Sequence, residues 1–190
     1  MAAPRREHLI DTAARLFNER GYHATGIDRI LAESGVAKMT LYNHFRSKDE
    51  LILAVLRRRD ETFRNRLMRA VEQAADTPRG RLLAIFDVLG DWFRAKDFHG
   101  CMFINASAEF GAPDSAIRAA SCEHKRLLTG YVEELAGEAG AAEPSVLAGA
   151  IMLLIEGAIV SAQINCDCAP ADQAKRAAET LIAAAGIPAA

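Results

Sequence analysis

Apolar residues recur at helical spacing along most of the chain, and short polar breaks separate the repeats. Leu9, Ala13 and Leu16 follow one another about a turn apart, which predicts a helix over about residues 5–20 that Gly21 ends. The same pattern predicts eight more helices, at about residues 27–34, 38–44, 48–75, 78–96, 102–110, 115–137, 145–165 and 170–185. No segment has the alternating pattern of a strand. The predicted fold class is therefore all-α, with about nine helices.

Several predicted helices begin with recognisable capping residues. Ser47-Lys-Asp-Glu50 has the pattern of a capping box, in which the serine and the glutamate bind free amides at the start of a helix. Thr77-Pro78 fits an N-cap followed by the first helical residue. Thr25 and Asp114 are likewise expected to cap the helices that follow them. These signals predict where helices begin independently of the apolar repeat.

Charge is distributed unevenly along this chain of 190 residues, whose formal net charge is −2. Residues 1–70 contain 14 lysines and arginines against 9 acidic residues, and the remainder contains 9 against 16. A basic first part joined to an acidic remainder is typical of a nucleic-acid-binding segment attached to another domain. Six of the basic residues lie between Arg57 and Arg69, where they can equally solvate a long helix.

The sequence indicates a cytoplasmic protein without a membrane span. Residues 1–20 lack the continuous apolar core of a secretion signal, and the longest apolar stretch, 147–162, is interrupted by Glu156. The four cysteines are therefore expected as reduced thiols. Cys166-Asp-Cys168 is too closely spaced for a structural zinc site, and neither a metal nor a cofactor is expected.

Two short helices at residues 27–34 and 38–44, joined by a turn that contains Gly35, have the arrangement of a helix-turn-helix. Leu41 and Phe45 must pack inward from the second of them. The remaining side chains then form a polar and aromatic face, made of Lys38, Met39, Thr40, Tyr42, Asn43 and His44. A DNA recognition helix needs such a face, because it hydrogen-bonds to base edges and phosphates.

Four segments carry a specific resemblance to a known family. They are Gly21-Tyr-His-Ala-Thr25, Ile30-Leu-Ala-Glu-Ser-Gly-Val36, Leu41-Tyr-Asn-His-Phe45 and Ser47-Lys-Asp-Glu-Leu51. Over about residues 5–56 they resemble the signature of the TetR family of bacterial transcriptional repressors. The resemblance implies a DNA-binding domain at residues 1–47 and a helical ligand-sensing and dimerisation domain at residues 48–190. It also implies a homodimer that represses transcription from a palindromic operator in double-stranded DNA.

The resemblance assigns expected DNA contacts to particular residues. Thr25, Tyr42 and Lys48 match phosphate contacts of the family. The positions that match its major-groove face are Lys38, Met39, Thr40, Asn43 and His44. Met39 replaces a smaller residue, and it either contacts a thymine methyl or only covers the DNA backbone. Tyr42 is either a DNA contact or a packed tyrosine, and His44 is either a DNA contact or a passive surface histidine. Ala37 stands where many members have a serine, so the recognition helix should lack a side-chain N-cap.

The predicted helix at residues 145–165 is apolar over more than one face. Its apolar stripe consists of Val146, Leu147, Ala150, Ile151, Leu154, Ile155, Ala158, Ile159 and Ala162. Gly149 and Gly157 allow another helix to approach closely. Such surfaces usually pack on themselves across a two-fold axis, which predicts a homodimer interface in the last two helices. The alternative is the core of an ordinary monomer.

An effector site is expected between the helices at residues 78–96 and 115–137. Its aromatic lining would be Trp92, Phe93, Phe103, Phe110 and Tyr131, with Asn105, Glu109 and His124 as polar groups. A small hydrophobic compound would suit this set. The alternative is that these aromatic residues belong to an ordinary core.

Cys101 lies in a second recognisable segment, Gly100-Cys-Met-Phe-Ile-Asn-Ala-Ser-Ala-Glu109. This segment resembles a Gly-Cys…Asn…Glu pattern of a TetR subgroup, some of whose members sense electrophiles or oxidants through the cysteine. Cys101 is expected at a helix N-terminus beside His99, and both features favour a thiolate. It is otherwise a small buried packing residue. The expected effector is therefore either a small hydrophobic compound or a thiol-reactive one.

Two other classes of protein explain less of the sequence. An enzyme could use Cys101 as nucleophile with His99 or His124 as base, but the sequence offers neither a third orienting group nor an oxyanion site. A non-specific nucleoid protein relies on phosphate neutralisation, which a net charge of −2 does not favour. An enzyme would also leave the polar face at residues 38–44 unexplained, so we expect a regulator and not an enzyme.

Overall fold

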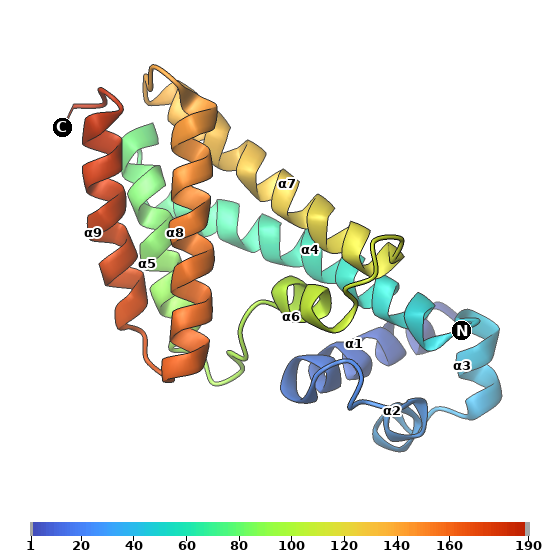
Figure 1. Cartoon of the computed structure of the whole chain (residues 1–190). Coiled ribbons are helices and arrows are strands. Elements are labelled where there is room, and N and C mark those ends of the chain that lie inside the picture. Colours follow the sequence, from blue (N-terminus) through green and yellow to red (C-terminus); the bar gives the residue numbers. More distant parts are fainter. Residues whose placement is uncertain (1, 189–190) are drawn as a thin grey trace. The chain divides into compact units, whose positions relative to one another are not determined.

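The structure, a computed structural model, describes residues 2–188, and its regular elements over that range are all helices (Figure 1). They are α1 (Ala2–Arg20), α2 (Ile27–Ser34), α3 (Lys38–His44), α4 (Lys48–Ala74), α5 (Pro78–Phe93), α6 (Met102–Glu109), α7 (Ala116–Glu138), α8 (Pro144–Asn165) and α9 (Ala169–Ala184). The all-α prediction is thus confirmed. The bounds of α2 and α3 are those predicted, whereas α5 ends at Phe93 and not near Lys96.

The described residues form two compact units. The first contains α1, α2 and α3, the part of α4 up to Thr62, and the segment from Cys101 to His124. The second contains Phe63–Gly100 and the residues from Lys125 onward, and so holds α5, α8 and α9. The apolar repeat does not predict that α6, which lies far along the chain, packs with the N-terminal helices.

The core of the first unit is built from the apolar faces that the repeat predicts. Leu9, Leu16 and Leu41 are 0% exposed, and α1 packs against both α2 and α3. Gly21 (φ 86°) and Gly35 (φ 64°) end α1 and α2 in the left-handed conformation, which side chains with a Cβ rarely adopt. These two turns let α2 and α3 fold back onto α1.

The predicted caps at Ser47 and Thr77 are confirmed. The Glu50 amide donates to Ser47 Oγ at 3.2 Å, and the Gly80 amide donates to Thr77 Oγ1 at 3.1 Å. The Glu50 carboxylate accepts the Arg46 amide at 2.6 Å, one residue before the N-cap. Loss of either cap should cost about 1 kcal/mol of stability.

The predicted cap at Asp114 is wrong. Helix α7 begins at Ala116, so its N-cap position is Ser115, whose Oγ accepts the Arg118 amide at 3.3 Å. Asp114 lies one residue too early for its side chain to bind the first free amides of the helix.

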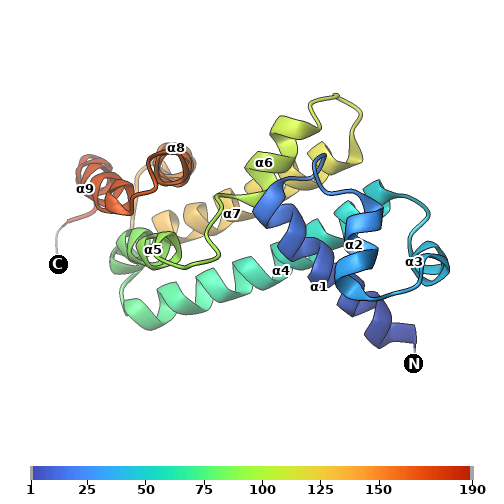
Figure 2. The ribbon, with the colours of Figure 1, turned by 90° about the horizontal axis from the view of Figure 1, so that it is seen from below.

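In the second unit, α8 and α9 lie side by side and α5 packs against both (Figure 2). Leu82, Ile85 and Phe86 of α5 are at most 1% exposed. Lys175 of α9 donates to both carboxylate oxygens of Asp87 of α5 at 2.7 Å. A surface pair of this kind contributes at most about 1 kcal/mol, so apolar burial dominates the association of these helices.

Candidate nucleic-acid interface

Helix α3 presents the predicted polar face to the surface. Leu41 is 0% exposed and Phe45 3% exposed, and these two side chains anchor the helix to the core. The opposite face consists of the exposed Lys38, Met39, Tyr42 and Asn43 and the half-buried Thr40 and His44. Ala37, the N-cap residue of α3, provides no side-chain cap, as expected. An ammonium, an amide, hydroxyls and an imidazole therefore project from one short helix, which suits hydrogen bonding to base edges.

One lysine belongs to this face and a second follows it at the start of α4. Lys38 Nζ lies 3.6 Å from Asp28 Oδ1, and both side chains are mostly exposed, so the pair is weak. Lys48 is the first residue of α4, and its Nζ donates to the His23 carbonyl at 3.5 Å. The ammonium of Lys48 and the free amides at the start of α4 both favour an anion, which suits a DNA phosphate.

Thr25 does not have the predicted geometry. The N-cap of α2 is Gly26, and the Thr25 side chain is 0% exposed. Its Oγ1 donates to the Gly21 carbonyl at 2.8 Å and to the Leu16 carbonyl at 3.3 Å. The hydroxyl hydrogen-bonds the turn to the end of α1, and it does not reach the surface, where a phosphate would lie.

Thr25→Val should therefore lower stability and leave DNA contacts intact. Valine keeps the shape of the side chain but leaves two buried carbonyls with one donor fewer, which should lower the free energy of unfolding by about 1–2 kcal/mol. Urea titration measures the change. If stability is unaltered while DNA affinity falls, the hydroxyl contacts phosphate after all.

Glu109, predicted as a polar group of the effector site, is bound to the turn between α1 and α2. Its Oε1 accepts the Tyr22 amide at 2.8 Å, and its Oε2 accepts the His23 amide at 2.6 Å and lies 2.8 Å from His23 Nδ1. The three contacts occupy the carboxylate, so Glu109 is not a free lining group. Nothing in the local sequence pattern could have indicated partners so distant along the chain.

His124 is buried in the first unit, where it links α7 to α4 and α6. Its Nδ1 lies 2.7 Å from Asp60 Oδ1, and its ring stacks on Phe103 with 3.7 Å between centroids. Cys101 is the N-cap residue of α6 and is 6% exposed. Of the predicted effector set, the first unit thus contains Cys101, Phe103, Asn105, Glu109, Phe110 and His124.

The other three residues of that set lie in the second unit. Trp92 contacts Phe63, Phe93 and Phe98, with ring centroids 5.1, 6.0 and 5.0 Å apart. The hydroxyl oxygen of Tyr131 is buried and has no hydrogen-bond partner in the described residues. Burial, assisted by nearby Glu72, raises the pKa of Tyr131, so its hydroxyl remains a donor at neutral pH.

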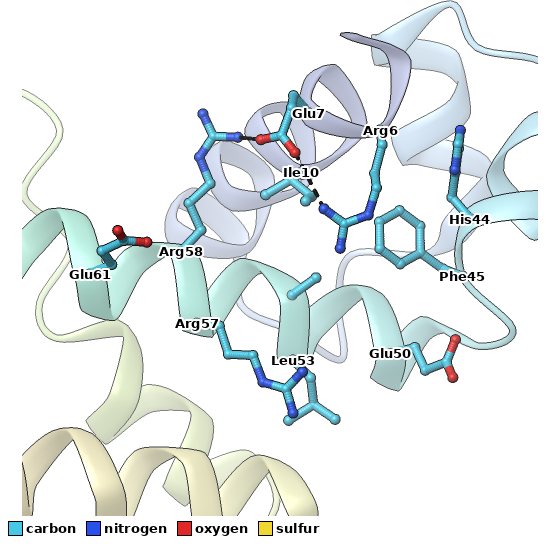
Figure 3. A pocket seen from close by; sticks show the side chains of 11 residues that line it. Arg6, Glu7, Ile10, His44, Phe45, Glu50, Leu53, Arg57, Arg58 and Glu61 are labelled. Atoms are coloured by element: carbon cyan, nitrogen blue, oxygen red, sulfur yellow. Dashed lines mark hydrogen bonds and ion pairs between the residues drawn. The ribbon is translucent and has the colours of Figure 1, made fainter. Parts of the chain in front are cut away.

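A groove of about 570 Å³ lies between the start of α1, the end of α3 and the first half of α4 (Figure 3). The Arg6 guanidinium lies 5.3 Å from the centroid of the Phe45 ring, and Arg58 pairs with Glu7. The charged lining residues are Arg6, Arg57, Arg58, Glu7, Glu50 and Glu61. Because the two signs balance, the groove has no net charge to select an anion. Over the described residues, no cluster of His, Cys, Asp and Glu could hold a metal ion.

Two family models match the sequence. The model described as bacterial regulatory proteins, tetR family, matches residues 9–55. The model described as tetracyclin repressor-like, C-terminal domain, matches residues 78–178. The first match contains α2 and α3, and the second extends from the start of α5 into α9.

Relatives with assigned names are transcriptional regulators. The chain is 41% identical over 88 residues to the HTH-type transcriptional activator FasR of Mycolicibacterium smegmatis, covering 46% of this chain and 40% of FasR. It is 30% identical over 105 residues to the HTH-type transcriptional repressor NemR of Escherichia coli, covering 55% of this chain and 53% of NemR. The chain thus aligns with about half the length of these relatives or less.

Solved structures match over nearly the whole chain. A TetR-family transcriptional regulator from Streptomyces coelicolor is 30% identical with a TM-score of 0.88, covering 96% of both chains. The reduced form of E. coli NemR is 25% identical with a TM-score of 0.88, covering 98% of this chain and 100% of NemR. The arrangement of nine helices over the described residues is therefore one that solved regulators share.

Proposed function

The chain belongs to the TetR family of bacterial regulatory proteins, and on that premise we propose that it is a transcriptional repressor that binds a palindromic operator as a homodimer. The observation that carries the proposal is the exposed polar face of α3, anchored from behind by Leu41 and Phe45. A short helix with this composition has no packing role on its outer face. Residues 1–47 would read the DNA, and residues 48–190 would sense the effector and hold the dimer together.

The proposed DNA contacts fall into two groups. Tyr42, 44% exposed, and Lys48 would bind phosphates and set the position of the helix on the duplex. Base edges in the major groove would be read by Lys38, Met39, Thr40, Asn43 and His44. One such helix spans too few base pairs to select a site, so two copies related by a two-fold axis are needed.

The proposed dimer interface is an exposed apolar strip along α8, here called the α8 strip. It contains Val146 (63% exposed), Leu153 (77%) and Ile164 (74%), together with the exposed Gly149 and Gly157 and the half-buried Ala150 and Val160. These positions recur every three or four residues and so share one face of the helix. Six residues that the sequence pattern put in the interface stripe are instead buried in the protomer's own core: Leu147, Ile151, Ile155, Ala158, Ile159 and Ala162. A second copy would cover the α8 strip.

Helix α8 is also long and apolar enough to cross a membrane, with 44% of its most apolar window buried inside the protein. Its buried face contains Leu147, Ile151 and Ile155, which pack within the second unit. A helix that packs in this core with one face and against a second copy with the other would be apolar on all sides without entering lipid. This supports a cytoplasmic dimer.

A competition titration tests the proposed DNA binding. The probe is the duplex that the protein enriches most from a randomised pool, and the competitor is a shuffled duplex of the same composition. A specific repressor should prefer the probe by about a thousandfold or more at physiological salt. Equal affinity for both duplexes, or failure to enrich any sequence, would overturn the proposal.

We propose a small hydrophobic effector for the sensing part. The Tyr131 hydroxyl, which is buried without a hydrogen-bond partner among the described residues, supports this. A hydrogen-bond acceptor on the ligand would pair with this hydroxyl, whose burial without a partner costs free energy. The second candidate is a thiol-reactive effector at Cys101. It is favoured by the N-cap position of Cys101 and by the similarity to a NemR structure described as reduced.

The two candidates predict different results when the wild-type protein is treated with a quinone. If Cys101 is the sensor, p-benzoquinone should release wild-type protein from DNA and leave Cys101→Ser bound, because only the thiol sulfur can add to the quinone carbon. If the effector binds without reacting, quinone should leave both proteins bound. Cys122→Ser is the matched control, since Cys122 is exposed. Mass spectrometry of the native protein after brief alkylation decides between them: a Cys101 less reactive than Cys122 contradicts the thiol sensor.

A further inference from the structure

Two of the four cysteines lie in one turn, which connects α8 to α9 (Figure 1). Cys166 is the C-cap residue of α8, and Cys168 is the N-cap residue of α9. Cys166 is exposed and Cys168 is half-buried, so each of the two residues is at least partly open to solvent. The turn of residues 166–168, here called the dithiol turn, belongs neither to the proposed DNA contacts nor to the proposed effector site.

Asp167 holds the dithiol turn against the start of α9. Its Oδ1 accepts the Ala169 amide at 3.1 Å, whereas Cys168 makes no side-chain capping bond. The Cys166 sulfur lies 4.0 Å from the Gln163 carbonyl oxygen, and a thiol is only a weak hydrogen-bond donor. The two thiols therefore do little to hold the turn together.

The two cysteine positions have a geometry that favours other residue types. Cys166 has φ 53°, and it is the one non-glycine residue with positive φ in the part of the chain that the structure describes. Glycine and asparagine most readily adopt this left-handed conformation at the end of a helix. The N-cap position of Cys168 favours serine, threonine, aspartate or asparagine. The geometry of the turn thus gives no reason for a cysteine at either position, so the two thiols call for another explanation.

The two thiols are close enough along the chain to bond to one common atom. Cα atoms two residues apart are at most about 7 Å apart even in an extended chain. Cysteines that are bridged directly have Cα atoms about 4.4–6.8 Å apart, and an atom between the two sulfurs lengthens that reach. A structural zinc ion needs four ligands, and over the described residues no group of three or more His, Cys, Asp and Glu could hold a metal ion. The dithiol turn therefore suits an atom that needs only two protein sulfurs.

We propose that the dithiol turn binds trivalent arsenicals, with both sulfurs bonded to one arsenic atom. Trivalent arsenic is pyramidal and holds its sulfurs on the same side, as a three-residue turn requires, whereas a linear two-coordinate ion holds them on opposite sides. With phenylarsine oxide, the arsenic–oxygen bond and the two S–H bonds break, and two As–S bonds form. The oxygen and both protons leave as water. The phenyl group stays on arsenic, which remains trivalent, so the step needs neither oxidant nor reductant.

Mass spectrometry of the native protein with phenylarsine oxide tests this site without DNA. Wild type should gain one phenylarsine oxide less one water. The adduct should survive excess 2-mercaptoethanol, a monothiol, and should be removed by 2,3-dimercaptopropanol, a dithiol. Trypsin should leave the adduct on the peptide of residues 127–175, whose only cysteines are Cys166 and Cys168. Cys122→Ser is the matched control, because Cys122 is an exposed thiol on α7, and it should behave as wild type.

Two substitutions should remove binding without weakening the fold. Cys166→Gly introduces the residue that best adopts the left-handed conformation, and Cys168→Ser introduces a preferred N-cap. Each variant should therefore keep or raise the melting temperature. Each also leaves only one sulfur, so the second As–S bond no longer forms within one molecule. Phenylarsine oxide should then bind about a hundredfold more weakly or worse.

The outcomes that would overturn the site are distinct from a loss of folding. The proposal fails if wild type forms no adduct that survives the monothiol, if the adduct maps to Cys101 or Cys122, or if either turn variant retains it. A purely structural role for the two cysteines predicts the opposite pattern. Both variants would then lower the melting temperature, and the monothiol would remove every adduct from wild type.

Discussion

Replacing Leu153 with glutamate should dissociate the dimer and abolish specific DNA binding with it. Leu153 is 77% exposed at the middle of the α8 strip, so the substitution leaves the protomer core intact. In a two-fold dimer the new carboxylate appears twice, and each unpaired buried charge costs about 3–5 kcal/mol. The dimer dissociation constant should therefore rise by about a thousandfold or more, since each 1.4 kcal/mol is tenfold. Sedimentation velocity should show a folded monomer.

The control for this experiment is Gln73→Glu, which adds the same charge on the exposed surface near the end of α4. It should leave the dimer unchanged. Ile151→Glu is not a suitable test, because Ile151 is 0% exposed and a charge there would unfold the protomer. A Leu153→Glu protein that remained a dimer and bound DNA normally would show that the interface lies elsewhere.

Lys48→Ala and Asn43→Ala should both weaken operator binding, but in different ways. Lys48→Ala removes one phosphate interaction per protomer, so affinity should fall for all sequences. The slope of log K against log salt should decrease by about 1.8 for the dimer, because each neutralised phosphate accounts for about 0.9 of it. Asn43→Ala removes an amide suited to an adenine edge. It should cost about 1–3 kcal/mol per half-site at the preferred base and relax the preference there. Mobility-shift titrations with single-base variants, repeated at several salt concentrations, measure both effects.

Lys96→Ala is the matched control for Lys48, because Lys96 is exposed and lies in the second unit. It should leave both affinity and salt slope unchanged. The assignment of α3 as the recognition helix is wrong if Asn43→Ala weakens all sequences equally, or if neither substitution changes the titration.

The helices and the polar face of α3 were predictable because both depend on neighbours a few residues apart. The apolar repeat identifies Leu41 and Phe45 as the residues of α3 that point inward. The helical period then predicts which residues lie on the opposite, exposed face. The cap at Ser47 was predictable for the same reason, since the serine and its amide partner are three residues apart.

The contacts of Thr25 and Glu109 were not predictable, because their physical causes are not local. Thr25 has the sequence pattern of an N-cap, whose hydroxyl would accept an amide, but its hydroxyl instead donates to the Leu16 and Gly21 carbonyls. Glu109 binds an amide 87 residues away, a partner that only the packing of α6 brings within reach. In a single sequence, nothing about a carboxylate at the end of a helix indicates such a distant partner.

The sequence pattern also could not predict which face of α8 points inward. Ile151 and Leu153 are both large and apolar, yet one is 0% and the other 77% exposed. When a helix is apolar all round, its period does not say which face packs within the protomer. The positions of α5 and α9 decide it, and these follow from the tertiary fold.

The central claim is that two copies of α3 read one operator symmetrically. The most direct test measures the affinity of wild-type protein for every single-base variant of the enriched duplex, together with the number of chains bound per duplex. The claim predicts two equal sets of sensitive base pairs related by a dyad, with centres about one turn of DNA (10–10.5 base pairs) or a multiple of it apart, and an even number of chains per site. One asymmetric set read by a single chain, or uniform tolerance of all substitutions, would contradict it.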